Sequence, residues 1–329
     1  MLANPNTPQL KSELAESLFQ LEKHFLTQCE TIEAWFDAQW LQTTPPIYGS
    51  VDLRNAGFKL APIDMNLFPA GFNNLNPDFV DSSIKASREV IEQLQPGTKN
   101  ILVVPESHTR NLFYWANVRT LLNVLEAAGY QTRLGFLSEE LKVAQKIELP
   151  SGESVTIEPL CREGDRLYVE GFEPELILLN NDLSDGIPAI LANVRQPVIP
   201  PASLGWSQRL KSGHFQYYAE VADEFASVTG IDPWLIAPYF RQCGKIDFMQ
   251  QDGMQCLLDH AEKLFAAIKL KYEEYSITQQ PFLVIKADAG TYGMAVMTVR
   301  NVDELRNMNR KQRTKMSTIK GGQSVSRVI

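Results

Sequence analysis

The order of apolar segments in the middle of the chain constrains the fold more than any other feature of the sequence. A helical segment over 78–94 precedes a short apolar run, NILVVP at 100–105, and a second helical segment over 112–128 leads into another strand-like run at 131–136. Short buried strands that alternate with helices are typical of a parallel sheet covered by helices. We therefore predict an α/β fold, in which ELILLNND at 175–182 supplies a further buried strand.

The rest of the chain is predicted to be helical at its start, antiparallel next to the sheet and mixed at its end. Apolar residues recur at three- and four-residue steps through 8–42, which predicts a helix. Alternating segments joined by turn residues over 146–170 predict antiparallel strands. Three prolines mark a boundary near 196–204. The segments expected to be helical beyond it are 207–228, 232–242, 252–275 and 302–309.

Composition argues against several classes of protein. A formal net charge of −8 argues against general affinity for nucleic acid or acidic membranes. No apolar run approaches the ~20 residues that cross a bilayer, and the first residues lack the pattern of a signal peptide. The four cysteines are scattered, with no histidine at metal-ligand spacing, and indicate reduced thiols. We therefore predict a cytoplasmic protein that acts on small molecules, with no nucleic-acid or membrane partner.

Residues 50–76, SVDLRNAGFKLAPIDMNLFPAGFNNLN, follow neither a helical nor a strand period for long. An ordered loop of this kind needs a partner for every buried amide and charge. One interpretation is a structural loop whose amides pair with backbone, and the other is a substrate-lining segment. Under the second, the candidate substrate-contacting groups are Asp52, Arg54, Lys59, Asp64, Asn66, Asn73 and Asn74.

Polar residues also follow two of the predicted strands. Glu106, His108 and Arg110 come after the strand at 100–105, and Asn181 and Asp182 close the strand at 175–182. In open α/β sheets ligands collect at the carboxyl ends of the strands, so both clusters are candidates for binding. A single histidine in such a loop more often forms a structural hydrogen bond than acts as a base.

A lysine and two glycines lie between two strand-like segments in FLVIKADAGTYGMAVMTV at 282–299. Lys286 would close the first strand, and Gly290 and Gly293 would let backbone N–H groups approach an anion. Neither a Walker A loop nor a dinucleotide-binding fingerprint is present. The pattern fits a lid over a polyphosphate, or a plain hairpin with a bulged turn and a solvated lysine.

The lysine-closed strand and its glycine loop resemble the lid of the ATP-grasp superfamily. Upstream, LLNND, the crossover QPVIPPASLGW and the helix entry Arg209-Leu210-Lys211 are similar in order to glutathione synthetases. More specifically, VDLRNAGFKLAPIDMNLFPAGFNNL, PESHTRNLFYWANV and FLVIKADAGTYGMAVMTV resemble the proteobacterial glutamate–cysteine ligases first recognised in acidophilic sulfur- and iron-oxidising bacteria. The resemblance runs from about residue 10 to the end.

This resemblance implies an enzyme that uses ATP and Mg²⁺ to join the γ-carboxylate of L-glutamate to L-cysteine, the first step of glutathione biosynthesis. It implies phosphate contacts from Lys211 and Lys286 and a lid formed by Gly290, Thr291, Tyr292 and Gly293. By charge type alone, Arg54, Lys59 and Arg110 are the candidate carboxylate clamps. The candidate substrate contacts, the acidic ones for α-amino groups, are Asp52, Asp64, Asn66, Asn73, Asn74, Glu106, Asn181 and Asp182.

The resemblance also implies a division into three parts. Residues 1–45 would form an N-terminal helical segment, 46–203 an α/β substrate domain, and 204–329 the first part of an ATP-grasp domain. That superfamily places an acidic hinge residue on the strand that 324–329, SVSRVI, would begin, and its metal-binding acidic and asparagine residues further on, so we expect the metal ligands beyond residue 329. Two alternatives stay open: another ATP-grasp carboxylate–amine ligase, and a non-catalytic fragment that binds a nucleotide or an amino acid.

Overall fold

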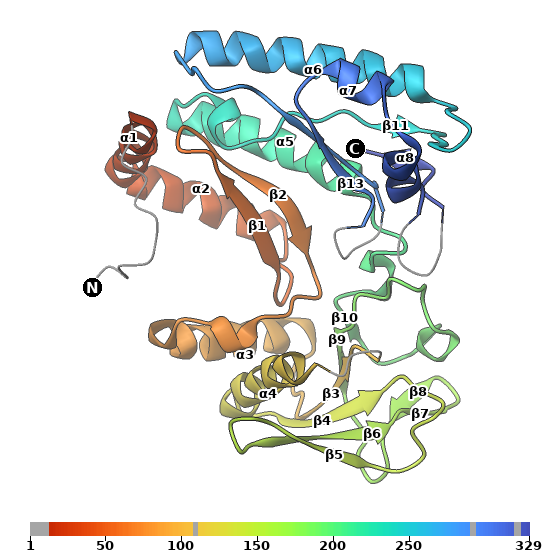
Figure 1. The fold of residues 1–329 in the computed structure, drawn as a ribbon. Helices are drawn as coiled ribbons and strands as arrows, with labels where there is room; N and C mark the ends of the chain where they lie inside the picture. The colour runs from red at the N-terminus through yellow and green to blue at the C-terminus, as the bar shows by residue number, and fades with distance from the viewer. Residues whose placement is uncertain (1–12, 108–110, 290–293, 319–323) are drawn as a thin grey trace. The chain divides into compact units, whose positions relative to one another are not determined.

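The computed structural model describes residues 13–107, 111–289, 294–318 and 324–329, with side chains from residue 18 onward. The chain divides into two compact units, coloured along the sequence in Figure 1. The first unit comprises 1–44, 51–65 and 210–329, and the second comprises 45–50 and 66–209. The three-part division expected from the sequence stays a prediction.

The second unit is built on a six-stranded sheet in the order β10-β9-β3-β4-β6-β5. Strands β3 (Asn100–Pro105), β4 (Gln131–Phe136), β6 (Ser154–Pro159), β9 (Leu176–Asn180) and β10 (Val198–Ile199) run parallel. Strand β5 (Gln145–Glu148) pairs with β6 in the antiparallel sense, and β7 (Cys161–Glu163) pairs with β8 (Arg166–Tyr168) as a separate hairpin. The predicted parallel strands and the antiparallel region are confirmed.

Successive residues of the central strands point to opposite faces of this sheet, and both faces are buried. Ile101 and Val103 contribute to a core beneath α3 (Val80–Leu94) and α4 (Leu112–Ala127), whose largest buried side chains include Ile91 and Leu125. Leu102 and Val104 face a second core, which includes Leu167 of β8. Burial on both faces explains why these strands read as unbroken apolar runs. Figure 1 shows the two helices packed along one side of the strands.

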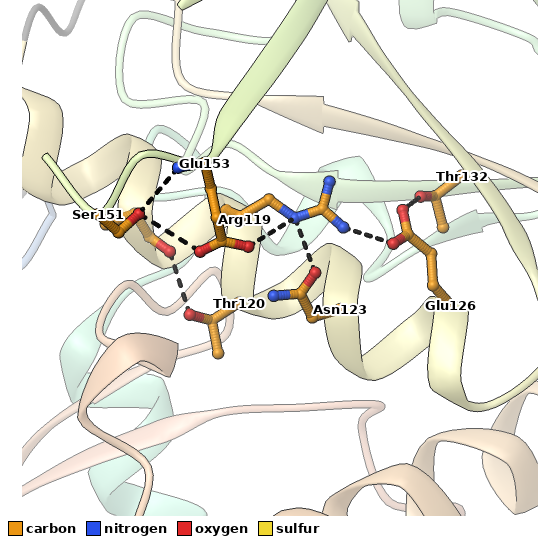
Figure 2. A network of polar contacts seen from close by, with 8 residues as sticks. Arg119, Thr120, Asn123, Glu126, Thr132, Ser151 and Glu153 are labelled. Carbon is orange, nitrogen blue, oxygen red and sulfur yellow. Dashed lines mark hydrogen bonds and ion pairs between the residues drawn. The ribbon is translucent and has the colours of Figure 1, made fainter. Parts of the chain in front are cut away.

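A polar network connects α4 to strand β4 and to the turn between β5 and β6 (Figure 2). The Arg119 guanidinium donates to the Asn123 amide at 2.7 Å and to the Glu126 carboxylate, which also accepts a hydrogen bond from the Thr132 hydroxyl at 2.8 Å. Glu153, in the turn between β5 and β6, lies 4.0 Å from the same guanidinium. Since Thr132 belongs to β4, the network ties one helix to two parts of the sheet.

The first unit consists of helices packed against short pairs of strands. Its helices are α1 (Glu13–Thr27), α2 (Cys29–Gln42), α5 (Lys211–Thr229), α6 (Met254–Glu274), α7 (Val302–Arg306) and α8 (Arg310–Ser317). Its strand pairs are β1 (Ser50–Asn55) with β2 (Leu60–Asn66), β12 (Leu283–Lys286) with β13 (Val296–Val299), and β11 (Cys243–Gly244) with β14 (Arg327–Val328). One core joins α6 to the last two pairs through Phe265, Ile285 and Val328. Among the described helices, none is long and apolar enough to cross a bilayer.

Two sequence-based predictions of local structure are wrong. Residues 50–76 contain the hairpin β1–β2 instead of being irregular throughout, followed by one-turn 3₁₀ helices at Phe72–Asn74 and Pro77–Phe79. Residues 232–242 form a single 3₁₀ turn, Pro233–Leu235, because Pro238 cannot continue a helix. The segment 8–42 is two helices in its described part. The helix predicted at 302–309 ends at Arg306, and the separate helix α8 follows it.

Candidate active site

The second unit contains a cavity of about 370 Å³ at the carboxyl ends of its parallel strands. Its polar lining comes from the segments that follow β3, β4 and β9, and its apolar lining also includes Leu160, which follows β6. Among the polar lining residues are Glu106, Ser138, Asn181, Ser184 and Asp185. This is the edge of an α/β sheet at which small ligands bind. Of the predicted substrate residues, Glu106 and Asn181 line the cavity.

Hydrogen bonds between neighbouring strand ends fix the floor of the cavity. One oxygen of Glu106 accepts from the backbone N–H of Asp182 at 2.7 Å, and the Asn181 amide donates to the carbonyl of Pro105 at 3.0 Å. The side chain of Asp182 accepts from the N–H of Ser184 at 3.0 Å, which forms a tight turn. Leu183 within this turn has a φ of 51°, a conformation that is rare for a residue with a side chain. The turn therefore serves to aim 183–186 into the cavity.

In the first unit, Lys286 ends β12 as predicted, and its strand pairs antiparallel with β13. The Lys286 ammonium donates to the carbonyl of Ile63 in β2 at 2.8 Å. An ammonium has three N–H donors, so this bond fixes the side chain and leaves it able to contact an anion. The loop residues predicted to form the lid, Gly290 to Gly293, lie outside the described residues.

Asp288, two residues after Lys286, is a buried carboxylate that the sequence did not single out. It is fully buried, and it accepts from the Ser212 N–H at 2.7 Å, the Ser212 hydroxyl at 2.8 Å and the Gln242 amide at 3.0 Å. Its own carbonyl accepts from the N–H of Lys211 at 2.8 Å. Asp288 thus caps the N-terminus of α5 from another segment, and a negative charge is favourable there.

The same contacts bring the two predicted phosphate-binding lysines onto connected segments. Lys211 is the first residue of α5, is buried, and is joined through its backbone to Asp288. Lys286 precedes Asp288 by two residues on the chain. Ile329 also pairs with Lys286, because the two residues exchange two backbone hydrogen bonds.

Lys59 was predicted as a carboxylate clamp, and the structure places it in an aromatic pocket of the first unit. Its ammonium donates to the carbonyl of Ala237 at 2.6 Å and lies 4.6 Å from the ring centre of Trp234. Burial lowers the pKa of Lys59 to about 7; nearby Asp232 opposes this shift, and Lys271 adds to it. Burial acts to raise the pKa of Asp232, but hydrogen bonds from Lys271, Trp234 and Tyr275 outweigh it and lower that pKa.

We expect Lys59→Met to stabilise the protein most at neutral and lower pH. Because the pKa of Lys59 falls from 10.5 to about 7 on folding, the unfolded chain binds the extra proton between these values. Wild-type stability therefore rises with pH across this window, and the cost of the buried charge is fully present below it. The difference in free energy of unfolding between Lys59→Met and the wild type should shrink by roughly 3 kcal/mol between pH 6.5 and 9.5. Urea unfolding at both pH values measures this, with exposed Lys263→Met as the control; a pH-independent difference contradicts the assignment.

Among the described residues, the other predicted substrate contacts are not part of the cavity lining. Asp52 and Arg54 are exposed on β1, where the Arg54 guanidinium lies 5.1 Å from the ring centre of Phe282. The side chains of Asp64 and Asn66 accept from nearby backbone N–H groups, at 3.0 and 2.8 Å. Asn73 and Asn74 are exposed in a 3₁₀ turn. Arg110 lies outside the described residues, as does His108. Their predicted roles stay predictions.

Sequence reasoning also missed a cluster of metal-ligating side chains in the first unit. The sulfurs of Cys243 and Cys256 and a ring nitrogen of His260 all lie within 4.8 Å of one another. Among the described residues it is the sole group of three or more such side chains. Mg²⁺ prefers oxygen ligands, so this donor set does not fit the ion expected for the reaction. The spacing of Cys256 and His260, four residues apart on one helix, was the available signal.

Comparison with known proteins decides the family. Residues 22–329 match the family GshA, glutamate-cysteine ligase. The chain belongs to the glutamate–cysteine ligase family. The chain is also similar to a crystal structure from Methylobacillus flagellatus KT, named "Putative gamma-glutamylcysteine synthetase", with a TM-score of 0.92 and 48% identity. That alignment covers 98% of this chain and 76% of the other. No curated protein sequence matches.

Membership confirms the predicted resemblance and the predicted enzyme class, a glutamate–cysteine ligase. It agrees with the mixed α/β architecture described above.

Proposed function

We propose that this glutamate–cysteine ligase uses ATP to activate the γ-carboxylate of L-glutamate and that its first unit carries an ATP-grasp-like nucleotide site. The observation that carries the proposal is the family match across 22–329. Three features of the first unit support the nucleotide site: a lysine that ends β12, an antiparallel hairpin around it, and a lysine at the start of α5. We further propose that ATP arrives as its magnesium complex, with no residue of the described chain assigned to the ion.

The proposed reaction has two steps. A γ-carboxylate oxygen of glutamate attacks the terminal phosphorus of ATP, and ADP leaves, which gives γ-glutamyl phosphate. The cysteine nitrogen then attacks the acyl carbon, phosphate leaves with the former carboxylate oxygen, and the amine loses a proton. Lys286 and Lys211 would bind the phosphoryl oxygens, since cations there offset the charge on the transferring group. An acyl phosphate hydrolyses in water, so the site must also exclude it.

We assign the cavity of the second unit to an amino-acid substrate. Its volume of about 370 Å³ is suited to a small zwitterion, and its rim combines carboxylates with amide and hydroxyl groups. Glu106 and Asp185 would bind an α-ammonium group, while Ser138, Ser184 and Asn181 offer hydrogen bonds. Because Glu106 is already held by the N–H of Asp182, it is positioned before a substrate arrives.

ADP release by the full-length protein tests the proposed function. We expect release that depends on glutamate and cysteine together, with γ-glutamylcysteine identified by mass. Glutamate alone, cysteine alone, and aspartate with cysteine serve as controls. Equal release with aspartate would favour a different carboxylate–amine ligase. Bound ATP without any dipeptide product would contradict the catalytic assignment altogether.

Glu106→Gln should weaken amino-acid binding while the fold survives. The amide oxygen of glutamine can still accept from Asp182, but the negative charge that faces an α-ammonium group is lost. We expect the KM for one amino acid to rise about 10- to 100-fold, equivalent to about 1.4–2.7 kcal/mol, with the KM for ATP unchanged. Steady-state kinetics with each substrate varied in turn measures this. The matched control is Glu140→Gln, an exposed carboxylate outside the cavity lining. Unchanged KM values for both amino acids in Glu106→Gln would remove Glu106 from the binding site.

A further inference from the structure

The cluster of Cys243, Cys256 and His260 lies outside the proposed nucleotide and amino-acid sites and has no part in the ligase reaction above. Cys243 is buried in β11, and Cys256 is exposed in the first turn of α6. Their sulfurs are 3.1 Å apart. The Nδ1 atom of His260 is 3.1 Å from the Cys243 sulfur and 3.9 Å from the Cys256 sulfur. The three potential metal-ligand atoms therefore lie close to one another.

These distances approach those of a transition-metal site. Thiolate ligands about 2.3 Å and an imidazole about 2.05 Å from a tetrahedral Zn²⁺ lie roughly 3.8 Å from sulfur to sulfur and 3.6 Å from sulfur to nitrogen. The observed sulfur–nitrogen separations of 3.1 and 3.9 Å bracket the expected value, and the sulfur–sulfur separation of 3.1 Å is shorter than it by roughly 0.7 Å. A movement of well under 1 Å per side chain would admit the ion. Two sulfurs and an imidazole are ligands that Zn²⁺ accepts and that Mg²⁺ and Ca²⁺ do not.

Local structure explains why the three groups converge. Cys256 and His260 are four residues apart on α6, so they share one face of the helix. Cys243 is held opposite them because β11 pairs with β14, where Cys243 lies beside Val328. The same core contains Cys243 and Leu257, the residue after Cys256. Two elements of secondary structure thus hold the ligands in place, which favours binding because the side chains lose little conformational entropy when the ion binds.

We propose that Cys243, Cys256 and His260 bind one Zn²⁺ ion, with a water molecule or an exogenous ligand in the fourth position. Among the described residues no carboxylate joins the cluster, which leaves that position open. The ion would link β11 to the start of α6 and so stiffen the sheet edge around Gln242. Gln242, the residue before Cys243, donates to Asp288, which caps α5. The ion would therefore be connected to this cap through one residue. The role we assign is structural support for the first unit.

Metal binding by the reduced full chain tests this proposal. We expect the metal-free wild type to take up one Zn²⁺ per chain in competition with a chromophoric chelator, and Co²⁺ to give thiolate-to-cobalt charge-transfer absorption. Cys256→Ser should weaken Zn²⁺ binding at least about 100-fold, because the change removes a ligand and not merely a neighbouring group. Addition of Zn²⁺ should raise the melting temperature of the wild type and leave that of Cys256→Ser unchanged.

Two controls separate ligation from general effects of the substitutions. Cys29→Ser changes an exposed cysteine on α2, outside the cluster, and should retain wild-type Zn²⁺ affinity. His260→Gln should lose affinity as Cys256→Ser does, although it leaves both thiols. Equal Zn²⁺ affinity in the wild type and Cys256→Ser overturns the proposal. The proposal is also overturned if the wild type takes up no Zn²⁺ and, without reductant, forms a Cys243–Cys256 disulfide, detected by mass after thiol alkylation.

Discussion

Lys286→Ala is expected to lower kcat/KM for ATP by about 100- to 1,000-fold while the protein remains folded. This range corresponds to the roughly 3–4 kcal/mol that a preorganised charged or polar donor contributes to the stabilisation of a transition state. The Lys286 ammonium is fixed by the Ile63 carbonyl at 2.8 Å, so it needs little reordering when ATP binds. Its side chain lies outside the buried core, which is why truncation should spare the fold.

Initial rates at varied ATP, with a circular dichroism melt of each variant, measure this effect. Lys286→Arg keeps the charge and should recover part of the activity, since a point charge is the main requirement. Lys269→Ala, an exposed lysine on α6, is the matched control and should match the wild type. Near-normal ATP kinetics in Lys286→Ala would remove the β12 strand end from the nucleotide site.

Asp288→Ala is expected to destabilise the first unit strongly. The substitution leaves the N–H and hydroxyl of Ser212 and the amide of Gln242 without their acceptor in a fully buried position. Each unsatisfied buried donor costs about 1–3 kcal/mol, so we expect a loss of at least about 3 kcal/mol in the free energy of unfolding. The loss of a negative charge at the start of α5 adds to it.

Denaturant unfolding of Asp288→Ala and of the matched control Asp223→Ala measures this loss. Asp223 is an exposed carboxylate on α5, and its replacement should change stability by less than about 0.5 kcal/mol. Asp288→Asn keeps one acceptor oxygen and should fall between the two. A loss in Asp288→Ala no larger than in Asp223→Ala would show that the cap is not important for folding.

The parallel sheet was predictable from sequence because its strands are buried on both faces. Runs such as 100–105 and 176–180 are almost wholly apolar, and the neighbouring helices α3 and α4 end shortly before Pro96 and Gly129. The hairpin β1–β2 was not predictable in the same way. Nearly every residue of β1 is exposed, so its strand has no apolar alternation to detect.

The candidate site was predictable where one segment carries the signal and not where two must meet. Lys286 at a strand end and Glu106 after β3 follow from local patterns. The role of Asp288 depends on Ser212 and Gln242, which are 76 and 46 residues away in sequence. Cys243 likewise joins Cys256 and His260 only through the pairing of β11 with β14. Tertiary contacts of this kind leave no periodic trace in a sequence.

Transfer of a labelled oxygen tests the central proposal most directly. Glutamate labelled with ¹⁸O in its γ-carboxylate is incubated with ATP, cysteine and the full-length protein, and the released phosphate is analysed by mass. Activation through γ-glutamyl phosphate predicts one ¹⁸O atom in each phosphate, because the oxygen that attacks ATP leaves with phosphorus. Phosphate that carries no label, in a reaction that yields γ-glutamylcysteine, would contradict the proposed mechanism.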